Sequence, residues 1–387
     1  MLQSPNFMKT RKLALAAISV AIMFTSCSKE DVIKKYENSL QNQIGFSAIG
    51  SNAQTKATPI TTTTIADFAA FAFSGTTYFM GENATGGVKV YRTVDTGAGT
   101  ATAWDYNEKA YWPKSDLLDF YAVSPWHDNT DNTIYGWNVG NTVQKIAYRA
   151  QNEFGADAAN SNIDVLYGIA TQQAANTNNG IVKFNFKHIL SQVLFKAKVQ
   201  YASMSVDINN ITICNVKDAG EFTFPTATED KKAEDVVATT GNNWNTTGSY
   251  SNFQVAPFET AVTVNSTTDA EWLSSDTNPI MLIPQTLAKW DVANESTKSI
   301  ESADAANLSY VKIVCTIKQN GVVLFSGDLY VPFGDSWEPG KRYIYTLIFG
   351  GGYDVQGDPV LRPIEFDAEV TEWVDATNDI NTSVGGL

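Results

Sequence analysis

Apolar and polar residues alternate over short runs along most of this chain. The clearest runs cover residues 181–186 and 364–373, where nearly every second residue is apolar. A period of two is typical of a strand with one face on a core, and the Asn, Gly, Asp and Thr residues between the runs are typical of turns. After the N-terminal segment, no long run has helical periodicity. The pattern therefore predicts an all-β chain with many turns.

The predicted strands fall into two groups. The first group comprises residues 44–49, 68–73, 88–91, 109–113, 117–123, 143–148 and 165–170, and the second comprises 181–186, 193–199, 206–216, 221–224, 280–283, 310–317, 322–331, 343–349 and 364–373. A polar, Asn-rich segment at 172–180 separates the groups. Residues 188–191 are expected to form one turn between strands, and residues 226–250 and 298–307 to be polar insertions. We predict two tandem antiparallel β-sandwich domains, over residues 42–178 and 179–387.

The first 27 residues have the layout of an export signal. Arg11 and Lys12 precede an apolar run that is too short to span a membrane, and small residues lead from it to Cys27. This cysteine resembles that of a bacterial lipobox, whose thiol is acylated after the signal is removed. We therefore expect a lipoprotein signal peptide over 1–26, an acylated Cys27 and a polar tether over 27–41. Each buried methylene of an acyl chain adds about 0.8 kcal/mol, so several acyl chains anchor a protein firmly. The alternative interpretation is a plain secretory signal with a coincidental cysteine.

Charge and cysteine content narrow the possible partners. The formal net charge is −14, and loss of the basic residues in the signal makes the mature chain more acidic still. An acidic chain without basic clusters is repelled by nucleic acid and by anionic membrane surfaces, which excludes both as partners.

Cys214 and Cys315 each lie in an apolar, strand-like run. Two buried thiols are the favoured interpretation, although a disulfide between them stays open.

The sequence offers no recognisable active site. His127 and His188 are the only histidines and have no partner at metal-ligand spacing, and no nucleophile elbow, P-loop or dinucleotide fingerprint is present. Asp128, Asp131 and Asn132 lie in a turn-rich segment and have side chains that can bind calcium. The glycine and the distal glutamate of an EF-hand are missing, so a solvated loop is the favoured interpretation. The chain has many Asp and Glu residues, but their spacing in the sequence cannot show whether two of them lie close enough to act as the acid and base of a glycosidase. We predict a protein without metal or cofactor that is not an enzyme.

Lys56 is the first of two features that point to assembly. It is the only Lys or Arg between Lys35 and Lys89, and it follows the first predicted strand. A trypsin-like protease that cuts between Lys56 and Ala57 frees this strand, which carries the apolar residues Ile44, Phe46, Ala48 and Ile49. The alternative interpretation is a surface lysine in a loop.

The closing strand is the second feature. Ile364, Phe366, Ala368 and Val370 form an apolar face, and acidic residues occupy the other face. The strand is either an ordinary core strand or one that can fill the groove of another subunit.

Several short motifs, in order along nearly the whole mature chain, resemble those of the fimbrillins of type V pili, which are lipoproteins of certain Gram-negative anaerobes. The motifs are YWP at 111–113 with LDFYA at 118–122, DVLYG at 164–168 leading into FKHILS at 186–191, MLIPQ at 281–285, SWEPGKRY at 336–343 and VTEW at 370–373. The resemblance implies two transthyretin-like β-sandwiches, with His188 as a structural residue at a strand–turn junction. The acidic pair Glu30-Asp31 after Cys27 resembles the signal that sends such lipoproteins to the cell surface.

The resemblance also implies a mechanism. A processing protease cuts after the first strand, strand 44–49 leaves, and the groove accepts a strand from another pilus subunit, of the same or a different kind. The family usually offers arginine at the cut, where this chain has Lys56, so a subunit that is never cut, such as an anchor, stays open. We predict a fimbrium subunit anchored in the outer membrane through its lipid and supporting adhesion. A monomeric glycan-binding surface lipoprotein is the alternative, and the sequence leaves open the shaft, tip or anchor role, the adhesion target and the donor strand.

Overall fold

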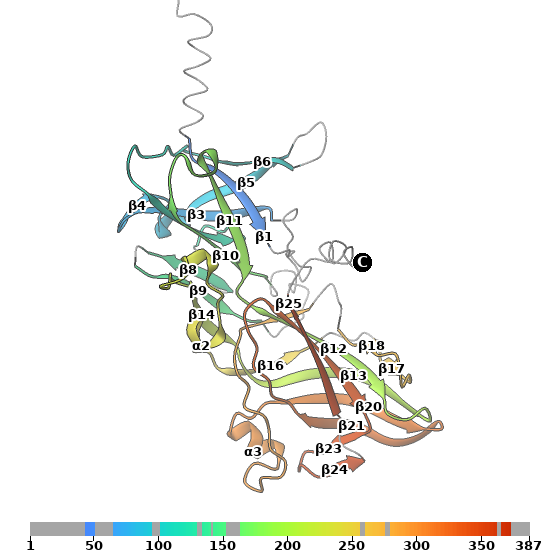
Figure 1. Ribbon diagram of the computed structural model, residues 1–387. Helices are drawn as coiled ribbons and strands as arrows, with labels where there is room; N and C mark the ends of the chain where they lie inside the picture. Colours follow the sequence, from blue (N-terminus) through green and yellow to red (C-terminus); the bar gives the residue numbers. More distant parts are fainter. Residues whose placement is uncertain are drawn as a thin grey trace, which may run out of the picture. The chain divides into compact units, whose positions relative to one another are not determined.

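The regular secondary structure of the described residues is mostly β, as the computed structural model in Figure 1 shows. The structure describes residues 43–50, 65–94, 101–129, 134–140, 142–151, 163–255, 260–274, 279–361 and 365–372. These residues form four sheets, which we number in the order in which they are described below. The predicted all-β class is confirmed.

The first sheet has eight strands and the second sheet has four. In spatial order the first sheet contains β1 (Gly45–Gly50), β11 (Ile181–His188), β10 (Leu166–Gln173), β7 (Leu118–Ser124), β3 (Asp67–Ser74), β5 (Val88–Val94) and β6 (Ala101–Tyr106), with β4 (Thr77–Met80) paired to β3. The second sheet contains β15 (Trp244–Thr246), β14 (Ala219–Thr223), β9 (Gln144–Arg149) and β8 (Tyr135–Val139). The two sheets share a core in which the rings of Tyr167 and Phe222 lie 4.9 Å apart between centroids.

The third and fourth sheets are built from the later part of the chain. The third sheet contains β18 (Glu271–Trp272), β12 (Ser191–Val199), β22 (Lys341–Phe349) and β25 (Glu365–Glu372), with β19 (Ile280–Leu282) paired to β12. The fourth sheet contains β16 (Tyr250–Gln254), β13 (Met204–Lys217), β20 (Tyr310–Gln319), β21 (Val322–Pro332), β23 (Gly351–Tyr353) and β24 (Pro359–Leu361), with β17 (Val262–Val264) paired to β13. Apolar side chains of both sheets, such as Phe195, Leu347, Ile313 and Leu329, are buried in one core.

The sheets are not wholly antiparallel, contrary to the sequence prediction. β1 pairs with β11 in parallel, and so does β12 with β22, while the other ladders are antiparallel. Alternation of apolar residues reports that a strand has one buried face, and it carries no information on the direction of its neighbour.

The sheets also do not follow the predicted division at residue 178. β11, at the predicted start of the second domain, pairs with β1 and β10 in the first sheet. The chain passes from the first to the third sheet at residues 189–190, a bend between β11 and β12. β14 then returns to pair with β9 in the second sheet, and β15 pairs with β14. The division into two sandwich domains stays a prediction.

Three local predictions are corrected by the structure. Residues 109–113 form no strand but contribute one isolated bridge, between Tyr111 and Gln43. Within the predicted insertion at 226–250 lie η4 (Ala233–Asp235), α2 (Thr240–Asn243) and β15. Within 298–307 lies α3 (Ile300–Ala305), which buries Ile300 and Ala303 beside Trp290 and is capped by the Ser299 side chain. Six residues carry too few apolar positions to show a helical period. The other short helices within the described residues are η1 (Asn83–Thr85) and η3 (Thr177–Gly180).

The motif SWEPGKRY turns the chain into β22. Trp337 is fully buried, and its indole N–H donates to the hydroxyl of Tyr345 over 2.9 Å. Gly340 has a φ of +68°, and its N–H donates to the carbonyl of Leu190. Glycine is favoured there because an L side chain rarely adopts this conformation. The motif therefore joins the start of β22 to the start of β12.

Both thiols in the described part of the chain are free and buried, as predicted. Burial raises the pKa of the Cys214 thiol to about 12, and that of the Cys315 thiol to about 12. The thiolate is the nucleophile, so a raised pKa keeps both groups protonated and unreactive in the folded chain.

We therefore expect iodoacetamide at pH 8 to leave both thiols unmodified in the folded chain from Ser28 onward, and to modify both in urea. Mass spectrometry after quenching reads the number of added groups. Folding raises both pKa values, so the thiols leave the free energy of unfolding unchanged below about pH 9. Above about pH 9 they lower it, because the unfolded chain ionises its thiols while the folded chain keeps them protonated. Modification of the folded chain at the rate of the unfolded one would contradict the buried placement.

Candidate functional site: the first strand and its groove

β1 is the strand that the sequence motifs predict to be displaced. Ile44, just before the strand, and Phe46 are buried in a core cluster, and Ala48 packs against the same cluster. Ile49 pairs with Asn185 in the ladder. The ladder to β11 runs from Gly45, opposite Ile181, to Gly50, opposite Phe186. β1 lies at the end of the strand order, beside β11 in Figure 1.

Phe46 lies at the centre of an aromatic cluster contributed by four other strands. Its ring centroid is 5.3 Å from that of Tyr106, 6.0 Å from that of Phe68, 6.1 Å from that of Phe184 and 6.2 Å from that of Phe120. Such ring pairs add about 0.5–1.5 kcal/mol each to the free energy of burial. A short strand of six residues therefore fills the middle of this core.

Further bonds hold the beginning of β1 on its other side. The Tyr106 hydroxyl donates to the Ile44 carbonyl over 2.8 Å and accepts from the Ala110 N–H over 3.1 Å. The Ile44 N–H donates to the Ala110 carbonyl over 3.0 Å. The start of the first strand is thus held between β11 and the segment after β6. Without β1, the described residues of this core would form an apolar groove with an open strand edge on β11.

β25 is the other strand that the sequence singled out, and it is not a core strand at its described positions. Ala368 and Val370 lie opposite Tyr345 and Tyr343 of β22, so they share the sheet face of these buried rings. Both are nevertheless exposed, Val370 to 53%, and so are Asp367 and Glu369 on the other face. β25 ends the third sheet and, among the described residues, is paired to β22 alone. At Ala368 and Val370 the predicted apolar face is therefore open to solvent.

The two singled-out strands carry the same apolar series. Ile44, Phe46 and Ala48 alternate with Gly45 and Ser47, and Ile364, Phe366 and Ala368 alternate with Glu365 and Asp367. A search for short repeats of alternating side chains would have found this signal, which the strand-by-strand analysis missed. Residues 364, 366 and 368 are thus of the same types, in the same order, as residues 44, 46 and 48.

Other predicted site residues are placed less fully. Cys27, Lys56, Ala57 and Ile364 lie outside the described residues, as do Asp131 and Asn132 of the candidate calcium loop. Within the part of the chain that the structure describes, no cluster of three or more potential metal ligands occurs, and no helix is long and apolar enough to cross a membrane.

His188 has the structural position that the resemblance implies. Its Nδ1 lies 3.0 Å from Oδ1 of Asp164, and both side chains are buried. The pair joins the beginning of β10 to the end of β11, where the DVLYG and FKHILS motifs meet. The two motifs are thus separate in the sequence and adjacent in the fold.

An exposed sheet edge is a place where a strand of another chain can pair. Comparison with known proteins gives the particular family. The model of the Fimbrillin-like family matches residues 55–373, and the chain belongs to this family of structural, non-enzymatic pilus proteins.

The chain is also similar to individual relatives and solved structures. The chain is 24% identical over 197 residues to the fimbrium subunit Fim1C of Phocaeicola vulgatus, an alignment that covers 46% of this chain and about half (49%) of that protein. A fimbrial protein from Bacteroides vulgatus has the same fold with a TM-score of 0.57 and 15% identity over 86% of this chain and 100% of that one. The tip fimbrial protein Mfa3 from Porphyromonas gingivalis matches 86% of this chain and 100% of its own with a TM-score of 0.41 and 11% identity.

Proposed function

We propose that this chain is a lipid-anchored fimbrial subunit of the outer membrane, and that it polymerises by strand exchange after a proteolytic cut at Lys56. In this mechanism β1 leaves its groove, and β25 of another subunit takes its place. Cys27 carries the anchor, and a trypsin-like protease makes the cut between Lys56 and Ala57.

The shared Ile-x-Phe-x-Ala series carries the proposal. A donor strand has to bury the same volume in the same order as the strand it replaces, because a core tolerates neither a cavity nor an excess of atoms. β25 meets this requirement with Ile364, Phe366 and Ala368 in place of Ile44, Phe46 and Ala48. Its exposed Ala368 and Val370 lose little when the strand leaves β22.

The same observation indicates the partner. Because donor series and groove occur in one chain, a second copy of this chain is the natural partner, and the product is a homopolymer. The fimbrial relative Fim1C and the family assignment support a role among pilus subunits at the cell surface. Adhesion is then a property of the assembled fimbrium.

Limited trypsin digestion of the chain from Ser28 onward tests the proposal. We expect one early cut after Lys56, loss of the fragment that carries residues 44–49 and growth of a ladder of oligomers that resists SDS. Intact mass and gel electrophoresis read the three events. Lys56→Gln is expected to abolish all of them, whereas Lys114→Gln, at an exposed lysine in the turn before β7, is expected to leave them unchanged.

Two results would count against the proposal. If Lys56 is cut but the fragment stays bound and the chain stays monomeric, strand exchange is wrong. If the chain forms oligomers without any cut, the protease has no part in assembly.

A further inference from the structure

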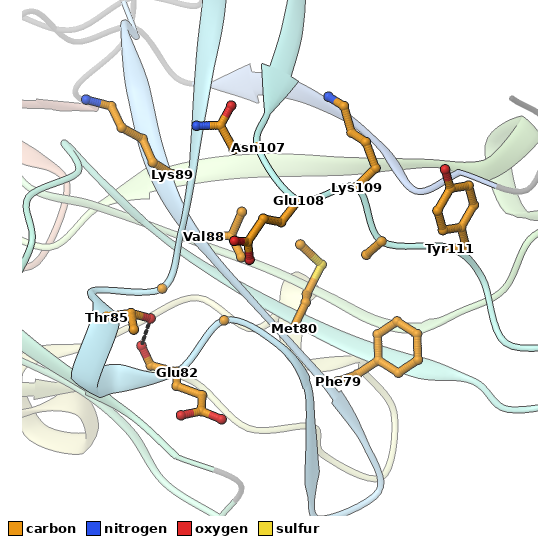
Figure 2. Close-up of a pocket in the computed structure, with 13 residues that line it drawn as sticks. Phe79, Met80, Glu82, Thr85, Val88, Lys89, Asn107, Glu108, Lys109 and Tyr111 are labelled. Carbon is orange, nitrogen blue, oxygen red and sulfur yellow. Dashed lines mark hydrogen bonds between the residues drawn. The ribbon is translucent and has the colours of Figure 1, made fainter.

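A cleft on the first sheet is not used by strand exchange. It has a volume of about 660 Å³ and lies between two segments: residues 79–89, which contain the end of β4, η1 and the start of β5, and residues 107–111, which follow β6. This volume is within the range of sites that bind small molecules, about 300–1,000 Å³. Figure 2 shows Phe79 and Tyr111 toward one end of the cleft, Glu108 in its middle and Thr85 toward the other end.

Two exposed aromatic rings set the chemistry of the cleft. Phe79 is 37% and Tyr111 52% exposed, although most large aromatic side chains of this chain are buried. A flat ring at the wall of a hollow packs against the C–H face of a pyranose ring as it would against another apolar surface. Asn107, Glu108 and Thr85 line the same cleft, and their amide, carboxylate and hydroxyl groups can bond sugar hydroxyls.

The charges around the cleft favour a neutral ligand. Two carboxylates, of Glu82 and Glu108, and two ammonium groups, of Lys89 and Lys109, line it, so their formal charges cancel. The lysines are also paired with carboxylates outside the lining, Lys89 with Asp67 at 3.2 Å and Lys109 with Asp105. An anionic ligand would have to displace these pairs, whereas a neutral polyhydroxy ligand can bond both carboxylate and ammonium groups.

The wall that carries Tyr111 is held in place before any ligand binds. Ala110 is bonded through its N–H to the Tyr106 hydroxyl and through its carbonyl to the Ile44 N–H. Glu108 has a φ of +52°, a conformation that a non-glycine residue keeps only where its surroundings hold it. A site that is formed in advance loses less conformational freedom when it binds.

We propose that this cleft binds a neutral saccharide of one or two rings, which stacks on Phe79 and Tyr111 and bonds Asn107 and Glu108. The cleft is complete in the uncut chain. The proposal is therefore independent of the cut at Lys56 and of strand exchange, and it gives an adhesive subunit a site for its target.

The test uses the uncut chain from Ser28 onward, which contains every described residue. The probes are the methyl glycosides of glucose, galactose, mannose, fucose and N-acetylglucosamine, together with lactose and maltose, each at up to about 10 mM, a concentration that detects millimolar affinity. Saturation-transfer NMR finds the binding sugar, and calorimetric titration gives its Kd. We expect Phe79→Ala and Tyr111→Ala each to weaken binding about tenfold or more, as loss of about 1.4 kcal/mol of stacking does.

Tyr201→Ala is the matched control, because Tyr201 is 46% exposed and lies outside the cleft. It is expected to leave the Kd unchanged, and urea unfolding of all three variants checks that they fold. The proposal is wrong if no probe binds, if a bound probe is indifferent to both cleft variants, or if a sulfated sugar or a lysine peptide binds the cleft more tightly than every neutral probe.

Discussion

Replacing Phe46 by alanine is expected to lower the free energy of unfolding by about 3–5 kcal/mol, the range for removal of a buried phenylalanine. The loss is at the upper end of single substitutions because the ring contacts four other rings that cannot close the cavity together. Urea unfolding of the uncut chain, followed by tryptophan fluorescence, gives the value. After trypsin treatment, the fragment with residue 46 is expected to leave sooner than in the parent chain.

Phe79→Ala is the control for this substitution. It removes the same atoms at a position of the first sheet that is 37% exposed, so the free energy of unfolding should change by about 0.5 kcal/mol or less. Equal losses for the two variants would mean that Phe46 does not fill the core of the first sheet, and the groove would lose its main anchor.

Replacing Ala368 by aspartate is expected to abolish growth of the oligomer ladder while leaving the monomer intact. In the chain itself Ala368 is exposed, so a carboxylate there stays in water. In the proposed polymer it takes the place of Ala48, which packs against the core of the groove. An unpaired carboxylate on that core costs several kilocalories per mole, and each 1.4 kcal/mol reduces association about tenfold.

Val323→Asp is the matched control. Val323 is 54% exposed on β21 and belongs to neither of the two exchanging strands. Trypsin is added to both variants, and the ladder is compared over time with that of the parent chain. If Ala368→Asp forms the ladder as fast as Val323→Asp, β25 is not the donor, and the donor has to be sought elsewhere in the chain.

The sequence alone predicted the structural properties that depend on neighbouring residues in the chain, namely strand positions and side-chain faces. Alternation located β1, β11 and β25, and it assigned Phe366, Ala368 and Val370 to one face, because the side-chain period of a strand is a local property. It does not reach what distant residues decide. Nothing in IVKFNF indicates that the neighbours of this strand are β1 and β10.

The same distinction applies to the two sites. Ile44 and Phe46 were singled out because an apolar strand followed by a lone lysine is visible in the sequence. The exposure of β25 was not predicted, because exposure depends on what the opposite sheet covers. The cleft was missed altogether. Phe79 and Tyr111 are 32 positions apart in the sequence, and the pairing of β4 and β5 with β3, and of β5 with β6, brings their segments to one hollow.

The bonds between Ile44 and the segment after β6 use only backbone atoms of Ile44: its N–H and its carbonyl. Any strand that occupies this place can therefore make them, whatever its side chains. In a polymer built by strand exchange, each newly arrived strand would restore the support of the Tyr111 wall in the subunit that receives it. The fibre would then carry one competent cleft per subunit, and many weak sites at regular spacing hold a multivalent surface far more strongly than one site does.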